Sequence, residues 1–308
     1  MVDYSKLMRL LNEKSISKTK LAKDVGISRD TLSKLTKNEP VRLEIIEKIC
    51  RYLNVIASEI IEFVDEEKNN PLLEVLIDEK NSNYKGGIYH ETQILLTYNS
   101  NHIEGSTLSE DQTRYIFETS TILFEKEQGI LVDDVIETIN HFNCIKFILD
   151  HVYDELNEDL IKELHKILKT GTKDAGLAWF NVGEYKLRSN VVGGRKTIPP
   201  SLVKSKIIVL LNKYSNIFKP TFEDIVDFHY EFECIHPFQD GNGRVGRLIA
   251  FKECLKYGYI PFVIDERLKA FYYRGLKEYS QEKGYLLDTC RSGQDRYKLL
   301  LDYFKIEY

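Results

Sequence analysis

The stretch that most constrains this 308-residue chain is residues 236–247, which read His-Pro-Phe-Gln-Asp-Gly-Asn-Gly-Arg-Val-Gly-Arg. The apolar residues 248–251 follow at once, so the glycines are expected at the start of a helix. Backbone N–H groups at a helix N-terminus are unpaired, and the helix dipole favours negative charge there. Because glycines lack a Cβ, a phosphate could approach those groups closely. The stretch therefore predicts a phosphate-binding helix start.

Four side chains of this stretch suit a bound polyphosphate. Arg244 and Arg247 are three residues apart, so both are expected on one helix face over the same anion. Asp240 offers the hard oxygen ligands that Mg²⁺ prefers, and His236 can exchange a proton near neutral pH. A glycine turn that merely caps a helix beside surface arginines would explain fewer of these features. The spacing matches neither a Walker P-loop nor a Rossmann fingerprint.

Residues 236–247 resemble, position by position, the signature H-P-F-x-[DE]-G-N-G-R-x-x-R of the Fic family, whose members transfer AMP from ATP to a hydroxyl group of a target. The resemblance implies that His236 is the general base and Asp240 the Mg²⁺ ligand. It also implies that Arg244 and Arg247 hold the outer phosphates. The remaining phosphate contacts are expected from Gly241, Asn242 and Gly243, where the Asn242 amide and the glycine backbone would stabilise charge on phosphate oxygens.

The charge of the chain is unevenly distributed. Residues 1–60 contain 12 Lys/Arg and 8 Asp/Glu, whereas the whole chain has a formal net charge of −5. Because residues 1–60 are basic and the rest of the chain is acidic, only the N-terminal segment is expected to bind an anionic polymer. Together with the polar residues 65–71, this predicts a small domain at 1–64, a linker at 65–71 and a second domain at 72–308.

The five cysteines are odd in number and show no C-x-x-C spacing, which argues against a disulfide framework or a zinc site. The N-terminus lacks an apolar signal stretch, and no run approaches the roughly 18 apolar residues of a membrane span. These observations predict a cytoplasmic protein that does not enter a membrane.

Residues 1–64 read as four short helices, with Ser17 and Ser28 as caps and Gly26 in a tight turn. Residues 21–28 resemble the helix-turn-helix of Cro/repressor-type domains. The resemblance implies a recognition helix that faces a DNA major groove through Arg29, Asp30, Ser33 and Lys34. Phosphate contacts would come from Lys18, Lys20, Lys37 and Arg42. Such a domain usually acts as a homodimer, and the alternative is a helical bundle that contacts proteins.

The run Ser-Asn-His-Ile-Glu-Gly at residues 100–105 resembles the inhibitory motif [ST]-x-x-x-E-[GN] of many Fic proteins. The expected inhibitory helix lies near residues 98–105. Glu104 at its end, with Gly105 as the stop, could present a carboxylate to Arg247. The resemblance implies a motif that begins at Ser100 and in which Glu104 occupies the γ-phosphate position, so that the enzyme inhibits itself.

The rest of the second domain shows helical periodicity broken by one extended segment. Helices are predicted within residues 91–98, 131–170, 201–235, 248–255 and 299–308. Glycines and β-branched residues in 171–200 predict a β-hairpin. Residues 183–191 resemble the flap of Fic proteins, whose exposed strand edge could align a target segment by backbone hydrogen bonds. The expected docking residues are Arg188, Ser189, Asn190 and Val191.

Two further groups of side chains have candidate roles. Tyr272 and Tyr273 resemble the aromatic wall that holds adenine in the family. His229 could join a metal site with His236, but the glycines and arginines favour phosphate, so it is predicted to be structural. Three other histidines are expected at the core edge or surface rather than as ligands: His141, His151 and His165.

These patterns predict a mainly α fold: a helical Fic core with a β-hairpin flap, preceded by an all-α helix-turn-helix domain. The expected activity is transfer of AMP from ATP, with Mg²⁺, to a Ser, Thr or Tyr hydroxyl of a target protein. Three alternatives stay open: a DNA-binding regulator that uses the Fic core as a nucleotide sensor, removal of AMP with Glu104 placing a water, and transfer of another nucleotide.

Overall fold

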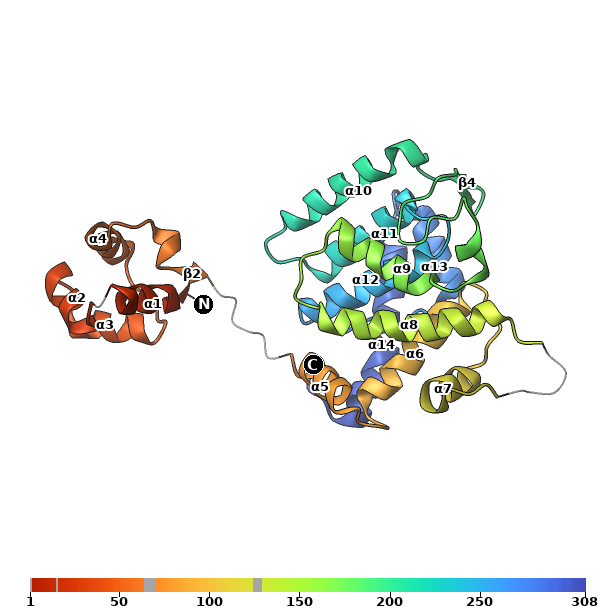
Figure 1. Cartoon of the computed structure of the whole chain (residues 1–308), viewed down its shortest axis with the longest axis horizontal. Helices are drawn as coiled ribbons and strands as arrows, with labels where there is room; N and C mark the ends of the chain where they lie inside the picture. Colours follow the sequence, from red (N-terminus) through yellow and green to blue (C-terminus); the bar gives the residue numbers. More distant parts are fainter. Residues whose placement is uncertain (1, 15, 64–69, 124–128) are drawn as a thin grey trace. The chain divides into compact units, whose positions relative to one another are not determined.

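The structure is a computed structural model that describes residues 2–14, 16–63, 70–123 and 129–308. The chain forms two compact units, Met1–Asn69 and Asn70–Tyr308, and helices make up most of each (Figure 1). The expected linker at 65–71 falls mostly outside the described residues. Its last residue, Pro71, instead opens a helix, with Asn70 as the cap.

In its described residues the first unit contains four α-helices: α1 (Ser5–Glu13), α2 (Lys18–Val25), α3 (Arg29–Thr36) and α4 (Leu43–Leu53). Ser17 Oγ accepts a hydrogen bond from the Lys20 N–H, and Ser28 Oγ accepts one from the Thr31 N–H, as N-caps do. Gly26 ends α2 with a φ of 71°, a left-handed conformation that favours glycine. The turn between α2 and α3 is therefore encoded locally.

A short sheet, which the sequence did not predict, closes the first unit. Strand β1 (Val2–Asp3) pairs antiparallel with β2 (Glu62–Phe63), just after the 3₁₀ turn η1 (Ala57–Glu59). The core beneath consists of aliphatic side chains from all four helices, among them Leu7, Leu21, Leu35 and Ile49. The sheet thus joins the two ends of this unit.

The second unit is built from ten helices in the described residues, joined by loops, a 3₁₀ turn and one hairpin. The first five are α5 (Pro71–Ser82), α6 (Ile88–His102), α7 (Glu110–Thr119), α8 (Val132–Asp150) and α9 (Glu158–Lys169). The last five are α10 (Pro200–Ser215), α11 (Phe222–Ile235), α12 (Asn242–Lys256), α13 (Glu266–Glu278) and α14 (Gly284–Phe304).

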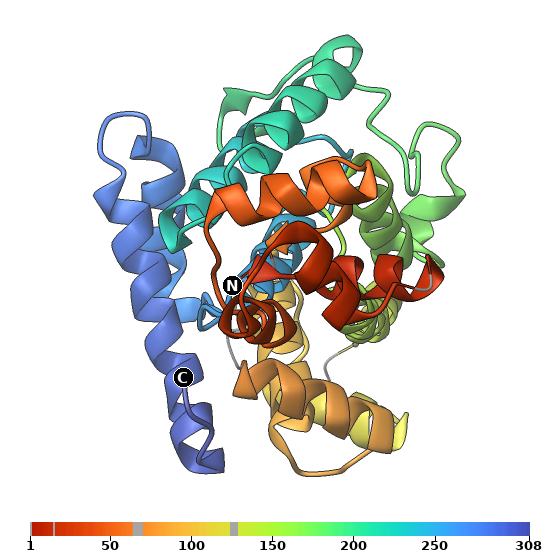
Figure 2. The same cartoon turned by 90° about the vertical axis from the view of Figure 1, so that its left-hand side faces the viewer.

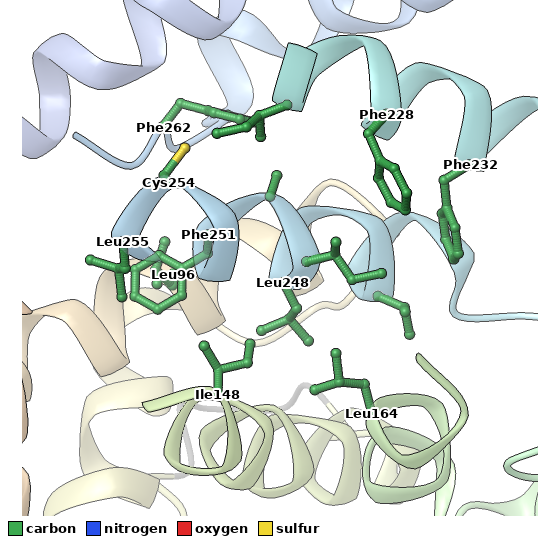
Figure 3. Packing of buried hydrophobic residues seen from close by; sticks show 14 of the residues in the cluster. Leu96, Ile148, Leu164, Phe228, Phe232, Leu248, Phe251, Cys254, Leu255 and Phe262 are labelled. Atoms are coloured by element: carbon green, nitrogen blue, oxygen red, sulfur yellow. The ribbon is translucent and has the colours of Figure 1, made fainter. Parts of the chain in front are cut away.

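Helix α12 lies at the centre of this unit, in contact with α6, α8, α9 and α11. Figure 3 shows Leu248 of α12 above Ile148 of α8 and Leu164 of α9, while Phe228 of α11 lies on the other side. Nearly every residue of α12 is buried. A helix that is enclosed on all sides holds its N-terminus in a fixed place, which suits it to present a binding site.

The hairpin is shorter than residues 171–200 suggested. Strands β3 (Val191–Val192) and β4 (Arg195–Lys196) have two residues each, and Val191 pairs with Lys196. Gly193 and Gly194 form the turn with φ of 54° and 77°. The rest of the segment is loop and the 3₁₀ turn η2 (Lys173–Gly176).

Two helix predictions in the second unit were wrong in extent. Helix α6 runs without interruption from Ile88 to His102, so Glu104 follows a long helix and not a short separate one. The last helix begins at Gly284, well before residue 299, and ends at Phe304; in Figure 2 it is the long blue helix along one side of the unit. The prediction for α6 failed because buried polar side chains, such as Gln93 and Asn99, interrupt its apolar periodicity.

All five cysteines lie in the described part of the chain, and none forms a disulfide. No helix among the described residues combines the length and the apolar character that crossing a bilayer requires.

Candidate active site

The signature forms the turn between α11 and α12. His236 ends α11 in the left-handed conformation (φ 52°), and Gly241 begins α12 with φ 77°. Asn242 closes the turn, because its Oδ1 accepts from the Phe238 N–H at 2.7 Å and its Nδ2 donates to the Phe238 carbonyl at 2.9 Å. The Asn242 side chain is thus used within the turn. Its expected contact with phosphate oxygens stays a prediction, and it would have to come from the second hydrogen of Nδ2.

His236 faces a cavity of about 650 Å³ beside the start of α12. Burial, assisted by the positive charge of Lys186, lowers the pKa of His236 to about 4, although Glu104 and Asp240 act in the opposite direction. The imidazole is therefore neutral at pH 7 and able to accept a proton. Its Nδ1 is buried and has no hydrogen-bond partner among the described residues.

Glu104 and Arg247 meet in the same cavity. Arg247 Nη2 donates to Glu104 Oε1 at 2.8 Å and to the Ser100 carbonyl at 3.0 Å, and Arg247 Nε donates to Ser100 Oγ at 3.1 Å. A Cβ on Gly243 would lie 2.1 Å from Glu104 Oε1, so the carboxylate fits only against a glycine. The structure thereby brings together Ser100, Glu104 and Arg247, as the resemblance implied.

The segment that carries Glu104 is held at its backbone as well. The Tyr273 hydroxyl, from α13, donates to the Ile103 carbonyl at 3.1 Å. Gly105 follows Glu104 with φ 104°, a conformation that requires glycine, and its N–H donates to the His102 carbonyl. The chain therefore leaves α6 sharply, and this places the Glu104 carboxylate at the glycine turn.

Asp240 and Arg244 belong to a second, charged cluster with Glu137 of α8 and Lys169 of α9. Asp240 Oδ2 accepts from Lys169 Nζ at 2.7 Å and from Arg244 Nη2 at 3.2 Å. Both cations also pair with Glu137. Burial alone would raise the pKa of Asp240, but the charges of Arg244 and Lys169 outweigh it and lower that pKa well below its usual range.

This cluster corrects the expectation that the two arginines share one anion. Arg244 is buried and points to Glu137 and Asp240, whereas Arg247 lines the cavity. The pairing with Glu137 decides this, because a buried guanidinium needs a carboxylate partner. Arg247 is consequently the signature arginine that a ligand in the cavity would meet.

Asp240 could still hold Mg²⁺. Half of its side chain is exposed (50%), and Mg²⁺ commonly takes one carboxylate while substrate phosphates and water complete its shell. No group of three or more His, Cys, Asp or Glu residues among those described could hold a metal ion by itself. Asp240 therefore fits a cation that arrives with a polyphosphate, because Lys169 and Arg244 both contact its Oδ2 and not its Oδ1.

The lining of the cavity also includes aromatic side chains and a second carboxyl group. Tyr272 and Tyr273 line it with Glu233 of α11. The Tyr272 hydroxyl forms a 2.7 Å hydrogen bond with His229 Nε2, so His229 is buried and structural, as expected. Burial raises the pKa of Glu233 to about 8, although the Arg247 charge opposes this. Glu233 is thus largely protonated at pH 7.

The flap residues divide into two kinds. Arg188 and Ser189 are exposed, and the Arg188 guanidinium lies 5.0 Å from the centre of the Trp179 ring. Val191 is also exposed (62%) at the start of β3, where a target segment could reach the strand. Asn190 instead points inward, and its Nδ2 donates to the carbonyls of Phe238 and Gln239 at 3.4 Å each.

Two of the three remaining histidines lie deeper than expected. His141 and His165 are fully buried core residues, and burial lowers the pKa of each to about 3. His165 stacks on Phe238 with ring centres 3.9 Å apart, which supports the signature turn from below. His151 is half-buried at the end of α8.

In the first unit, the predicted recognition residues lie on α3. Arg29 and Asp30 are exposed in its first turn, while Ser33 and Lys34 are half-buried. Lys34 Nζ lies 3.4 Å from Asp30 Oδ2, so this pair would have to separate for both to contact DNA.

Sequence reasoning missed four charged residues of the site: Glu137, Lys169, Lys186 and Glu233. The partners Glu137 and Arg244 are 107 positions apart, so no local pattern joins them. The one available signal was Glu233, which precedes His236 by three positions and therefore lies on the same face of α11.

Comparisons with known proteins agree with this architecture. Residues 155–253 match the sequence profile of the Fic/DOC family, and residues 6–66 match that of the Cro/C1-type HTH DNA-binding domain. The second unit resembles the crystal structure of a Fic-domain-containing signaling protein from Bacteroides thetaiotaomicron. That match has a TM-score of 0.60 and 24% identity, and covers 76% of this chain and 96% of the other. Residues 155–253 thus match the Fic/DOC family model, and the fold resembles that of a solved Fic-domain structure.

Two separate segments of the chain therefore match two family models, a Cro/C1-type helix-turn-helix domain and a Fic domain. It is 29% identical over 193 residues to protein adenylyltransferase fic-1 of Caenorhabditis elegans, covering 60% of this chain and 36% of that protein. It is 31% identical over 188 residues to protein adenylyltransferase Fic of Drosophila mojavensis, covering 58% and 35%. The match spans little more than a third of the length of these relatives.

Proposed function

We propose that this chain transfers AMP from ATP to a Ser, Thr or Tyr hydroxyl of a target protein. One observation carries the proposal: a neutral imidazole, His236, and a guanidinium, Arg247, face one cavity at the glycine turn that opens α12. The cavity is large enough for a nucleotide, whose typical pockets begin at about 300 Å³. The names of the curated relatives support the same reaction.

In the proposed reaction, His236 takes the proton from the target hydroxyl as that oxygen attacks the α-phosphorus of ATP. The bond from the α-phosphorus to the bridging oxygen breaks, and pyrophosphate leaves. Backbone N–H groups at the start of α12, with Arg247, hold the phosphate oxygens. Tyr272 and Tyr273 hold the adenine, and the exposed edge of β3 near Val191 aligns the target segment.

Asp240 is the proposed ligand of a Mg²⁺ ion that would accompany ATP and neutralise charge on its phosphates. The half-exposed carboxylate of Asp240 supports this assignment. Lys169 and Arg244 would keep the Asp240 carboxylate in place while it holds the ion.

Glu104 is proposed to inhibit the chain. Its carboxylate pairs with Arg247 and lies against Gly243, where an outer phosphate would otherwise approach the helix start. ATP could then bind only with its α-phosphorus poorly aligned for in-line attack. Removal of AMP, in which Glu104 would place a water, uses the same geometry and would appear as release of AMP from a modified target.

DNA binding through α3 is a second proposed function, and it concerns the first unit alone. The exposed Arg29 at the start of α3 and the capped α2–turn–α3 geometry support it. Two copies of the chain would give the affinity that a single recognition helix lacks.

Substituting His236 tests the proposed reaction. His236→Asn keeps a residue that tolerates positive φ, so the turn should persist. Because the wild type is proposed to be self-inhibited, the substitution is made in the Glu104→Gly background. There we expect transfer of label from α-³²P-ATP to fall by at least roughly a hundredfold while ATP affinity stays within about twofold. His151→Ala, remote from the cavity, is the control. Undiminished transfer by His236→Asn would exclude the proposed base, and label from γ-³²P-ATP in the product would indicate phosphate transfer instead.

A further inference from the structure

Lys186, at the base of the flap, is a buried cation without a charged partner. It is 2% exposed, and its Nζ donates to Asn190 Oδ1 at 2.9 Å and to Thr197 Oγ1 at 2.6 Å. Both acceptors are neutral, and within the described parts of the chain no carboxylate forms an ion pair with Lys186. Burying an ammonium group in this way costs stability, so its presence calls for a functional reason.

The same residues tie the flap to the loop that follows His236. The Lys186 N–H donates to the Pro237 carbonyl at 2.9 Å. Asn190, which holds Lys186 Nζ, also donates to the carbonyls of Phe238 and Gln239. The ammonium group is therefore held at a fixed place relative to the His236 imidazole.

Charged groups surround His236 from several elements, and Arg247 of α12 and Glu233 of α11 line the same cavity. Glu104 after α6 and Asp240 in the signature loop favour its protonated form, and Lys186 from the flap opposes them. A bound triphosphate would add several negative charges and so favour protonation further. An imidazole that is already protonated cannot take a proton from a hydroxyl group. In the proposed function Arg247 would be paired with the phosphates, whereas Lys186 in the flap would still counteract this effect.

We propose that Lys186 is a positioning residue that keeps the His236 imidazole unprotonated beside a bound triphosphate while fixing the flap to the signature loop. The triphosphate in this statement rests on the proposed function, whereas the action of Lys186 on His236 does not. Lys186 stays mostly charged at pH 7, because burial lowers its pKa only to about 8.

The direct test is the titration of His236 by NMR in protein with ¹³C-labelled histidine. The chain has 7 histidines, and the His236 signal is the one that His236→Asn removes. We expect Lys186→Met to raise the titration midpoint of His236 by roughly one pH unit, the effect of one nearby charge. Lys186→Arg should keep the wild-type midpoint. Lys162→Met is the matched control, since Lys162 lies 4.7 Å from the neighbouring Tyr185 ring and is not among the groups that act on His236.

Lys186→Gln is a second neutral variant that should fold more readily, because the amide of the introduced glutamine can still donate to Asn190 or Thr197. It should raise the midpoint as Lys186→Met does. An unchanged midpoint in a folded neutral variant would overturn the inference, whatever the transfer activity. If the Glu104→Gly variant transfers AMP, the acidic limb of its pH–rate profile should move upward by the same amount when Lys186→Gln is added. A shifted midpoint in a chain that transfers no AMP would overturn the proposed function and leave this inference standing.

Discussion

The Glu104 carboxylate lies 2.8 Å from the Arg247 guanidinium and packs against Gly243 in the lining of the cavity. The pair joins the end of α6 to the first turns of α12, 143 positions apart in sequence. Arg247 Nη1 is buried and has no hydrogen-bond partner among the described residues. The guanidinium is therefore held by Glu104 and Ser100 but retains an N–H for another acceptor.

Tyr273→Phe should loosen the segment that carries Glu104, because it removes the hydroxyl that donates to the Ile103 carbonyl. One such hydrogen bond contributes about 1 kcal/mol, so we expect basal AMP transfer to rise by up to roughly fivefold. Self-modification with labelled ATP measures this change. Tyr285→Phe, on a partly exposed residue of α14, is the control. A lower rate would instead assign the Tyr273 hydroxyl to nucleotide binding.

Lys169→Met should destabilise the second unit by roughly 3 kcal/mol, because it leaves Glu137 and Asp240 facing a single cation, Arg244. Lys166→Met on the same helix removes an exposed ion pair with Glu163 and should cost less than about 1 kcal/mol. Urea denaturation followed by the single tryptophan, Trp179, compares the two variants. Equal losses would show that the charged cluster adds little to stability.

The free energy of unfolding should fall as the pH drops below about 6.5. Burial lowers the pKa of His141, His165 and His229 to about 3, so the unfolded chain binds protons that the folded chain excludes. Each histidine then removes up to about 1.4 kcal/mol per pH unit between 6.5 and 3. Glu233, with its raised pKa, acts in the opposite sense but is a single group. His165→Gln should flatten the slope, as urea midpoints at pH 7 and 5.5 would reveal; an unchanged slope would contradict the assignment.

Arg29→Ala in the full chain should weaken binding to duplex DNA by roughly tenfold, since Arg29 is exposed at the start of α3. Fluorescence anisotropy at several salt concentrations measures both the affinity and the number of phosphates contacted. Arg51→Ala, on an exposed arginine of α4 that pairs with Glu47, is the control. If the two variants bind alike, α3 is not the recognition helix.

Much of the fold could be predicted because the residues that begin and end its helices are close together in sequence. Ser17, Gly26 and Ser28 specify the α2–turn–α3 unit through side-chain caps and one positive φ. The signature predicted the start of α12 in the same way, through Gly241. The extent of α6 could not be predicted, since its buried polar residues, such as Gln93 and Asn99, find partners only in the folded chain.

The candidate site was predictable only where its residues belong to a recognisable sequence motif, either residues 236–247 or residues 100–105. His236, Arg247 and Glu104 share the cavity that the signature and the upstream motif suggested. The position of Arg244 could not be predicted, because its partner Glu137 lies on α8. Hydrophobic periodicity does not indicate which charged side chains will form ion pairs. Lys186 was hidden for the same reason, since a buried lysine looks like any surface lysine in sequence.

The central claim is that Glu104 blocks a competent AMP transferase, and intact-mass spectrometry of the Glu104→Gly variant tests it most directly. After incubation with ATP and Mg²⁺, we expect a mass increase of one or more AMP groups on Glu104→Gly, and little on the wild type or on the exposed-loop control Glu155→Gly. The double variant Glu104→Gly, His236→Asn should remain unmodified. The account is contradicted if the Glu104→Gly variant, given ATP, modifies neither itself nor any protein of a cell lysate. It is also contradicted if the wild type is modified as much as the variant.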